Sequence, residues 1–283
     1  MKVLVTGYNG QLGFDVVKRL EKSGVECKGV DIDDFDLTDR EQTVDYICNY
    51  NPDAIVHCAA YTAVDKAEEA RELCFNVNVN GTANIRSAAE ACGAKLVYIS
   101  TDYVFPGTGE KPWEIYDSTG PCNYYGYTKL EGEKALSGYD KLFIIRISWV
   151  FGINGHNFVK TMLSLADKYS ELRVVDDQIG SPTYTYDLAV LICEMLQTEK
   201  YGTYHATNEG YCSWADFADY IFECAGKAVK VNHITTEEYG KTPAVRPKNS
   251  RMSKAAIDQN GFKRLPTWQD ATKRYVDILV NEG

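Results

Sequence analysis

The chain has 283 residues, of which 45% are hydrophobic and 25% charged, and its formal net charge is −10 at pH 7. This length suffices for a large α/β domain with or without a smaller companion, and the negative charge disfavours a nucleic-acid surface. No apolar run approaches the roughly 18 residues that a membrane span requires, and the first residues do not have the pattern of a signal peptide. We therefore expect a cytoplasmic protein with neither a nucleic-acid partner nor a membrane partner.

The cysteines and histidines do not form a metal or disulfide pattern. Nine cysteines are scattered along the sequence, and no two of them are spaced C-x-x-C. Their odd number and irregular spacing argue against a disulfide framework and against a zinc knot. The four histidines show no paired ligand spacing. The sequence therefore predicts reduced thiols and no catalytic metal.

The N-terminus has the pattern of a strand, a glycine turn and a helix. The apolar run 2–6 leads into Gly7, Gly10 and Gly13, after which apolar residues recur at helical spacing. Glycines let the backbone approach a pyrophosphate, and the N-terminus of a helix supplies free N–H groups. The pattern predicts that these three glycines bind a dinucleotide cofactor.

A second apolar run, 26–30, ends in Asp31. This acid follows Gly13 by about 18 residues, close to the spacing of roughly 20 at which a carboxylate binds the adenosine ribose. A third run, 54–58, ends in the small residues Ala59 and Ala60, which leave room for a cofactor along the strand ends. The three runs therefore predict one cofactor site at one edge of a sheet.

The residues with acid/base character follow later. The apolar run 96–99 ends in Ser-Thr-Asp, so Thr101 is expected at the carboxyl end of a strand, where open α/β sheets place their sites. Tyr125 and Lys129 are four residues apart and share one face of a predicted helix. A cation beside a phenol favours the phenolate, so we expect Lys129 to lower the pKa of Tyr125. This set predicts acid/base chemistry on a carbonyl or an alcohol.

Strands alternating with helices predict a Rossmann-type, doubly wound parallel sheet in a dinucleotide-binding domain, 1–150. The regular alternation of strands and helices weakens after residue 150, which indicates a smaller α/β substrate lobe over 151–283. The boundary is expected to interleave, because the strand pattern at 202–207 is able to rejoin the large sheet. Helical spacing over 65–92 predicts one long, kinked helix, and Ser213 is a plausible N-cap of another helix.

In this order, the glycine turn, Thr101 and the Tyr125–Lys129 pair resemble the extended short-chain dehydrogenase/reductase family. Further stretches extend the resemblance to reductases of nucleotide-linked keto sugars over nearly the whole chain: 10–13, 59–68, 100–105, 148–150, 157–162, 177–183 and 246–251.

The resemblance implies a role for each matching residue. Thr101, Tyr125 and Lys129 would be catalytic, and Tyr125 and Lys129 would also contact the cofactor. The other implied cofactor contacts are Gly10, Gln11, Leu12, Asp31, Asp36, Leu37, Ala60, Tyr61 and Thr62. The implied substrate contacts are Thr101, Asp102, Trp149, Asn249 and Arg251.

The resemblance also implies the reaction, which is reduction of the C4 keto group of dTDP-4-dehydro-β-L-rhamnose with NADPH or NADH. The substrate would thus be a nucleotide-linked deoxysugar, and a homodimer is left open as the assembly. A sugar dehydratase would carry an Asp-Glu pair after the Thr, whereas Asp102 precedes Tyr103. Another nucleotide-sugar reductase or a 4-epimerase of the same family stays as an alternative, as does a non-catalytic NADP-binding regulatory subunit.

Overall fold

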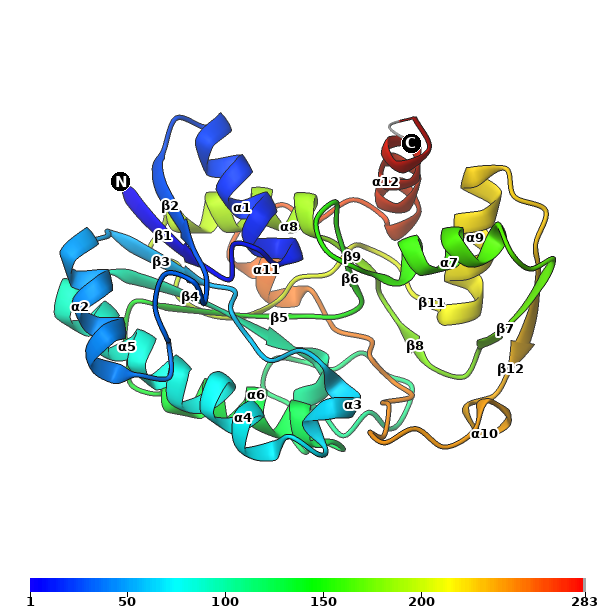
Figure 1. Ribbon diagram of the computed structural model, residues 1–283, viewed down its shortest axis with the longest axis horizontal. Coiled ribbons are helices and arrows are strands. Elements are labelled where there is room, and N and C mark those ends of the chain that lie inside the picture. The colour runs from blue at the N-terminus through cyan, green and yellow to red at the C-terminus, as the bar shows by residue number, and fades with distance from the viewer. Residues whose placement is uncertain (282–283) are drawn as a thin grey trace.

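A six-stranded parallel sheet forms the centre of the larger of two lobes (Figure 1). The computed structural model describes residues 1–281. The strands lie in the order β10-β5-β4-β3-β1-β2, and each neighbouring pair is parallel. They are β1 Lys2–Thr6, β2 Glu26–Val30, β3 Ala54–His57, β4 Lys95–Thr101, β5 Leu142–Ile147 and β10 Gly202–His205. The predicted α/β class with a Rossmann-type sheet is confirmed.

The remaining elements are helices and short strands. The helices are α1 Gln11–Lys22, α2 Arg40–Tyr50, α3 Val64–Ala67, α4 Arg71–Phe75, α5 Gly81–Cys92, α6 Tyr124–Ala135, α7 Phe158–Ala166, α8 Thr185–Leu196, α9 Trp214–Ala225, α10 Thr236–Tyr239, α11 Ala255–Gln259 and α12 Trp268–Asn281. The short strands are β6 Val150–Phe151, β7 Glu171–Val175, β8 Ile179–Gly180, β9 Thr183–Tyr184, β11 Cys212–Ser213 and β12 Lys230–Ile234. In the described part of the chain, none of these helices is both long and apolar enough for a membrane span.

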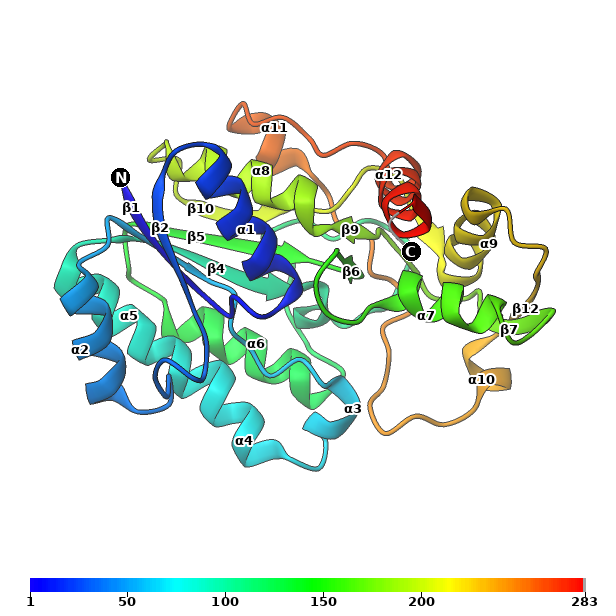
Figure 2. The same cartoon turned by 45° about the horizontal axis from the view of Figure 1, so that its top comes forward.

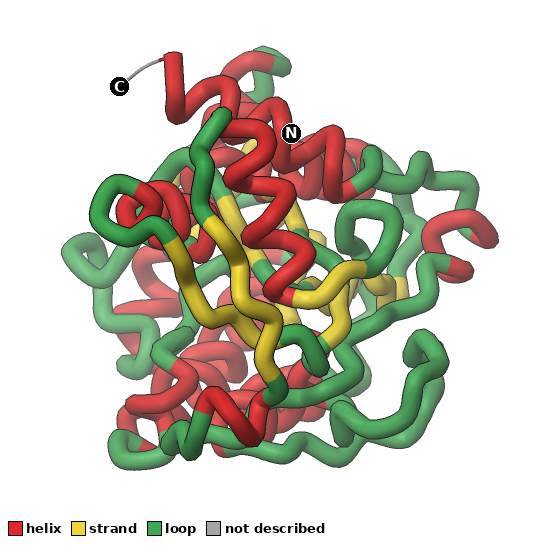
Figure 3. Tube along the Cα trace, turned by 90° about the vertical axis from the view of Figure 1, so that its right-hand side faces the viewer, coloured by secondary structure: helices red, strands yellow, loops and turns green. Residues whose placement is uncertain are grey.

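Helices cover both faces of the large sheet (Figures 2 and 3). Helices α1 and α8 lie on one face, and α2, α5 and α6 lie on the other. Successive residues of β1 point to opposite faces, so Val3 packs in the core beneath α1 and Leu4 in the core shared with α2. A strand buried on both faces has to be apolar throughout, which explains the continuous apolar runs of the sequence.

The second half of the chain returns to the large sheet. Strand β10 pairs with β5 in parallel register, with Tyr204 opposite Ile145, and helix α8 packs against the same sheet. The lobes are therefore interleaved along the sequence.

The smaller lobe is built from α7, α9, α12 and the parallel pair β7 and β12 (Figure 1). Its core is rich in aromatic side chains, among them Phe151, Phe217 and Tyr275. Helix α9 begins with a capping box in which Ser213 and Asp216 bond each other's backbone N–H groups. Ser213 is thus the N-cap that the sequence predicts.

The predicted single helix over 65–92 needs correction. Helix α3 ends at Ala67 and is separated from α4, whereas 71–92 run on as α4, a π-helical turn at Asn76–Asn80, and α5. The π-helical turn faces inward, and Asn78 is 1% exposed. Its amide bonds with the loop of Tyr61 and with α6, contacts that no local spacing reveals.

Candidate active site

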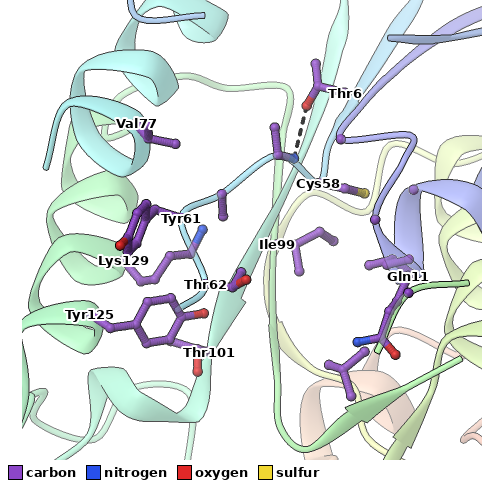
Figure 4. A pocket seen from close by; sticks show the side chains of 18 of the residues that line it. Thr6, Gln11, Cys58, Tyr61, Thr62, Val77, Ile99, Thr101, Tyr125 and Lys129 are labelled. Atoms are coloured by element: carbon purple, nitrogen blue, oxygen red, sulfur yellow. Dashed lines mark hydrogen bonds between the residues drawn. The ribbon is translucent and has the colours of Figure 1, made fainter. Parts of the chain in front are cut away.

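A cavity of about 900 Å³ lies at the carboxyl ends of the central strands and extends to the smaller lobe (Figure 4). Every residue expected to contact the cofactor lines it. Of the seven residues that the resemblance implies for catalysis or for the substrate, five also line it: Thr101, Asp102, Tyr125, Lys129 and Trp149. The structure therefore brings these residues to one cavity. The contacts of these residues determine which ligands the cavity can bind and which reaction it can support.

The glycine turn forms a cradle for an anion. Gly7 has φ +70°, and a Cβ atom there would lie 2.6 Å from the backbone nitrogen of Ala59, so a larger residue does not fit. Gly10 is the N-cap of α1 and supplies no side chain to its first N–H groups. These donors and the positive end of the helix dipole are therefore free for a pyrophosphate, and the cradle fits the predicted dinucleotide.

The carboxylate of Asp31 lies at the end of β2 and is fixed by two backbone donors. Its Oδ2 accepts from Asn9 N and its Oδ1 from Ile32 N, both at 2.9 Å. Lys129 is the one Lys or Arg among the described residues that line the cavity. The adenosine end therefore suits a ribose hydroxyl, since it offers no side-chain cation to a 2′-phosphate.

A buried hydrogen-bond network fixes the loop after β3. Asn78 Oδ1 accepts from Tyr61 N at 2.8 Å, and the hydroxyl of Thr6 accepts from Ala59 N at 3.2 Å. His57 bridges Thr6 and Thr82 through its two ring nitrogens. Burial lowers the pKa of His57 to about 3, so the imidazole is neutral and acts as a spacer in this network.

Thr101 and Asp102 form a buried pair where β4 ends. Thr101 Oγ1 donates to Asp102 Oδ1 at 3.1 Å and accepts from Tyr103 N at 3.2 Å. Asp102 is 3% exposed, and its Oδ2 has no hydrogen-bond partner among the described residues. Burial raises the pKa of Asp102 to about 7, so its carboxyl is partly protonated near neutral pH.

Tyr125 and Lys129 lie one turn apart on α6 and point into the cavity (Figure 4). Asn123 caps this helix by accepting from Gly126 N at 2.8 Å. Burial lowers the pKa of Lys129 to about 7, and its Nζ lies 4.2 Å from the centre of the Tyr98 ring. The ammonium is thus desolvated.

The expected effect of Lys129 on Tyr125 needs correction. Burial, followed by the negative charge of Asp102, raises the pKa of Tyr125 above its usual value. The effect of desolvation on the pKa of Tyr125 is therefore larger than any effect of the Lys129 ammonium. The phenol stays protonated at neutral pH, which suits a proton donor better than a base.

Helix α6 approaches the turn after Thr101 unusually closely. A Cβ atom on Gly126 would lie 2.3 Å from the carbonyl oxygen of Tyr103. The rings of Tyr103 and Tyr125 meet edge to face with centroids 5.8 Å apart. Glycine at this position thus allows the helix of Tyr125 to lie beside Thr101.

A buried ion pair supports the inner side of α6. Arg146 donates to both carboxylate oxygens of Glu133, at 2.9 and 2.7 Å, and Ser100 donates to Oε1 at 2.5 Å. Glu133 lies one turn beyond Lys129, and its charge opposes the effect of burial by raising the pKa of Lys129. The pair therefore joins α6 to β5 and favours the charged form of Lys129.

Two tryptophans form the wall of the cavity toward the smaller lobe. Trp149 has φ +49°, and its ring stacks on that of Trp214 with centroids 3.8 Å apart and an interplanar angle of 16°. Trp214 is the first residue of α9, and both residues line the cavity. Trp214 was not among the expected site residues, because it comes 65 residues after Trp149 in the sequence and belongs to no site motif.

Asn249 and Arg251 do not lie among the residues that line the cavity. The side-chain amide of Asn249 donates to the carbonyls of Thr108 and Lys111, and its Oδ1 accepts from Arg251 Nη1 at 3.0 Å. Asn249 is 1% exposed. In this structure both residues serve to anchor the loop before α6 and do not face the site.

A candidate cation cluster lies outside the cavity. Asp176, Asp216 and His233 bring one ligand atom each to within 4.8 Å of one another, and all three side chains are exposed. His233 is already hydrogen-bonded to Asp219 at 2.8 Å and to Asp176 at 3.2 Å. The ring nitrogens of His233 are thus both engaged with carboxylates.

Comparison with known proteins agrees with this geometry. The family model described as RmlD substrate binding domain matches residues 1–281. The spore coat polysaccharide biosynthesis protein SpsK of Bacillus subtilis is 41% identical over 97% of this chain and 96% of its own. A dTDP-4-dehydrorhamnose reductase of Sinorhizobium fredii is 40% identical over 100% of this chain and 99% of its own.

A solved structure gives the same result. The dTDP-4-dehydrorhamnose reductase of Bacillus anthracis, in complex with NADP, superposes with a TM-score of 0.95 at 42% identity, over 98% of this chain and all of that one. The predicted resemblance to nucleotide-sugar reductases is therefore confirmed, and the chain belongs to the RmlD substrate binding domain family.

Proposed function

We propose that this chain reduces the C4 keto group of dTDP-4-dehydro-β-L-rhamnose to dTDP-L-rhamnose with NADH or NADPH, in nucleotide-sugar biosynthesis. The proposal rests mainly on one observation: the same cavity contains the glycine turn and the side chains of Thr101, Tyr125 and Lys129. The names of relatives at about 40% identity over the whole chain supply the substrate.

The roles of the catalytic residues follow from the charge that develops on the substrate. A reduced nicotinamide cofactor, when bound in the cavity, supplies the hydride for the C4 carbon. Tyr125, which its raised pKa keeps protonated, donates a proton to the C4 oxygen, and the hydroxyl of Thr101 stabilises the developing alkoxide. Lys129 orients the nicotinamide ribose and adds positive charge beside Tyr125.

In this proposal the larger lobe binds the cofactor and the smaller lobe helps to bind the sugar nucleotide. The larger lobe holds the cofactor between the glycine turn and Asp31, and the smaller lobe contributes Trp214 beside Trp149 for the sugar nucleotide. The unpartnered Oδ2 of Asp102 is suited to a sugar hydroxyl, because a buried carboxyl oxygen without a partner is costly.

Two alternatives make different predictions. A 4-epimerase would use the same three residues to oxidise and then reduce one substrate, with no net change in cofactor. A regulatory subunit would bind the cofactor without turnover. The intact set of Thr101, Tyr125 and Lys129 in one cavity disfavours the second alternative.

One assay separates these functions. We expect nicotinamide absorbance to fall on addition of dTDP-4-dehydro-β-L-rhamnose, with dTDP-L-rhamnose as the product identified by NMR. Substrates of 4-epimerases and of 4,6-dehydratases, assayed beside it, should not be converted. Turnover of an epimerase substrate at constant absorbance, or cofactor binding with no turnover of any substrate, would reject the proposal.

The proposal also covers the cellular compartment and the oligomeric state of the protein. Both reactants are charged nucleotides, which do not cross membranes unaided, so we place the protein in the cytoplasm. We also propose a homodimer, as the family resemblance allows, and sedimentation equilibrium would test it.

A further inference from the structure

The thiols of Cys48 and Cys92 lie in contact, with their Sγ atoms 3.5 Å apart. Cys48 is near the end of α2, and Cys92 is the last residue of α5. The two helices lie side by side on the same face of the large sheet and share one core that includes Ile47 and Ala89 (Figure 2). The contact joins residues 44 positions apart, so the sequence spacing did not reveal it.

We propose that Cys48 and Cys92 form a modification site, in which a reversible intramolecular disulfide arises by exchange with a low-molecular-weight disulfide. Neither residue lines the cavity, so the pair is separate from the residues proposed to bind the cofactor and substrate.

The geometry allows the bond to form with small movements. A disulfide needs an S–S distance of about 2.05 Å, so the sulfurs have to approach by roughly 1.5 Å, which side-chain rotation at the ends of two helices can supply. Both thiols are partly exposed. A groove of about 460 Å³ runs between the same two helices, beside the cysteines, although neither cysteine lines it. Its lining residues are Arg40, Glu41, Val44, Asp45, Ser87 and Ala91.

The exchange is balanced in two steps. One protein thiolate attacks oxidised glutathione, which forms a mixed disulfide and releases one glutathione thiolate. The second protein thiolate then attacks the protein sulfur of the mixed disulfide and releases the other glutathione. The protein loses two electrons and two protons, and one glutathione disulfide is reduced to two thiols.

The local environment determines the rate of this exchange. Burial, followed by the neighbouring Cys48, raises the pKa of Cys92 to about 11. Few Cys92 thiolates exist at neutral pH, so the exchange should be slow there and faster in mild alkali. The pair thus differs from a catalytic dithiol, whose thiolate is stabilised.

The disulfide would fix the outer wall of the cofactor site. Asn84, on α5, donates to the carbonyls of Leu37 and Thr38 at 3.0 and 3.2 Å, and these two residues line the cavity. Asp39 caps the start of α2 by accepting from Gln42 N at 3.1 Å. A bridge between Cys48 and Cys92 closes the segment 48–92, which contains Asn84 but not Leu37 or Thr38, so it reaches this wall through the hydrogen bonds of Asn84.

Peptide mapping tests the proposal directly. The folded parent protein is exposed to oxidised glutathione at about pH 8.5, free thiols are then alkylated, and proteolytic peptides are identified by mass spectrometry. We expect a cross-linked peptide that contains Cys48 and Cys92 as the main disulfide product, and its loss on treatment with dithiothreitol. We also expect the oxidised protein to melt about 5 °C higher than the reduced protein.

Single variants provide the controls. Cys48→Ser and Cys92→Ser should each keep glutathione on the remaining thiol, because the resolving partner is absent, whereas Cys224→Ser should cross-link as the parent does. Glutathione adducts on the parent without a cross-link, a cross-link that prefers another cysteine, or a Tm that does not rise on oxidation would each overturn the proposal.

Discussion

Asn78 donates a hydrogen bond to Thr128 Oγ1 at 2.9 Å and so joins the π-helical turn to α6 at the residue before Lys129. The oxygen of the same amide accepts from Tyr61 N at 2.8 Å. One buried side chain therefore holds both the loop along the cofactor and the helix that carries Tyr125.

Replacement of Asn78 with Ala should impair both catalysis and stability. The change leaves Tyr61 N without its acceptor, and an unsatisfied buried group costs about 1–3 kcal/mol. The Thr128 hydroxyl loses one donor but keeps its hydrogen bond to the carbonyl of Tyr125. We expect kcat/KM to fall by at least about tenfold and the free energy of unfolding in urea to fall measurably. Asn80→Ala, an exposed change on the same turn, is the control. Equal effects of the two changes would contradict the role of Asn78.

Replacement of Tyr125 with Phe should remove the proton donor and keep the ring. We expect kcat to fall by about two to four orders of magnitude while cofactor affinity, measured by fluorescence titration, is kept. Tyr124 and Tyr127 flank it on α6 and serve as controls. If Tyr125→Phe turns over at nearly the parent rate, another group donates the proton.

The titration of Asp102 should make stability depend on pH. Burial raises its pKa from 3.8 to about 7, so the fold favours the protonated form. Its contribution to the free energy of unfolding is therefore fully present below pH 3.8 and is lost as the pH rises to about 7.

Asp102→Asn removes this titration. Relative to the variant, the parent should lose roughly 3 kcal/mol between pH 4 and pH 7, because each pKa unit corresponds to about 1.4 kcal/mol and the folded carboxyl is still about half protonated at pH 7. Urea unfolding at several pH values measures the difference, and Asp45→Asn, at an exposed position on α2, is the control. A parent-minus-variant difference that is flat over this range would show that Asp102 does not have a raised pKa.

Replacement of Asp31 with Ala should shift cofactor preference toward NADPH. The fixed carboxylate repels a 2′-phosphate, and no Lys or Arg lines the described cavity at that end. We expect the parent to use NADH at least as well as NADPH, and the ratio of kcat/KM for the two cofactors to change in the variant. The NADP complex of the Bacillus anthracis relative makes this comparison informative. An unchanged ratio would show that Asp31 does not read the 2′ position.

Local patterns predicted those parts of the site that lie where a strand ends. The glycine turn, Asp31, Thr101 and the Tyr125–Lys129 pair each follow from a short stretch of sequence, and the parallel sheet brings them to one cavity. Trp214 was missed because its position depends on the packing of the smaller lobe against Trp149.

Burial explains the remaining errors. The pKa of Tyr125 depends on how much water the fold excludes, and the sequence shows only that a lysine is nearby. An Asn side chain is able to bind a ligand, but the amide of Asn249 is already hydrogen-bonded to the carbonyls of Thr108 and Lys111 and to the side chain of Arg251. Neither property can be inferred from spacing along the chain.

The return of β10 to the edge of the large sheet limits how the protein can be dissected. A fragment that stops at residue 150 would lose β10 and α8, and with them the cover over Phe143 and Ile145, which are fully buried in the intact chain. Such a fragment would present a bare apolar sheet edge to its neighbours and should aggregate. A chimeric protein therefore cannot take the cofactor-binding lobe from this chain as one continuous segment. It would also need α8 and β10 from the second half of the chain.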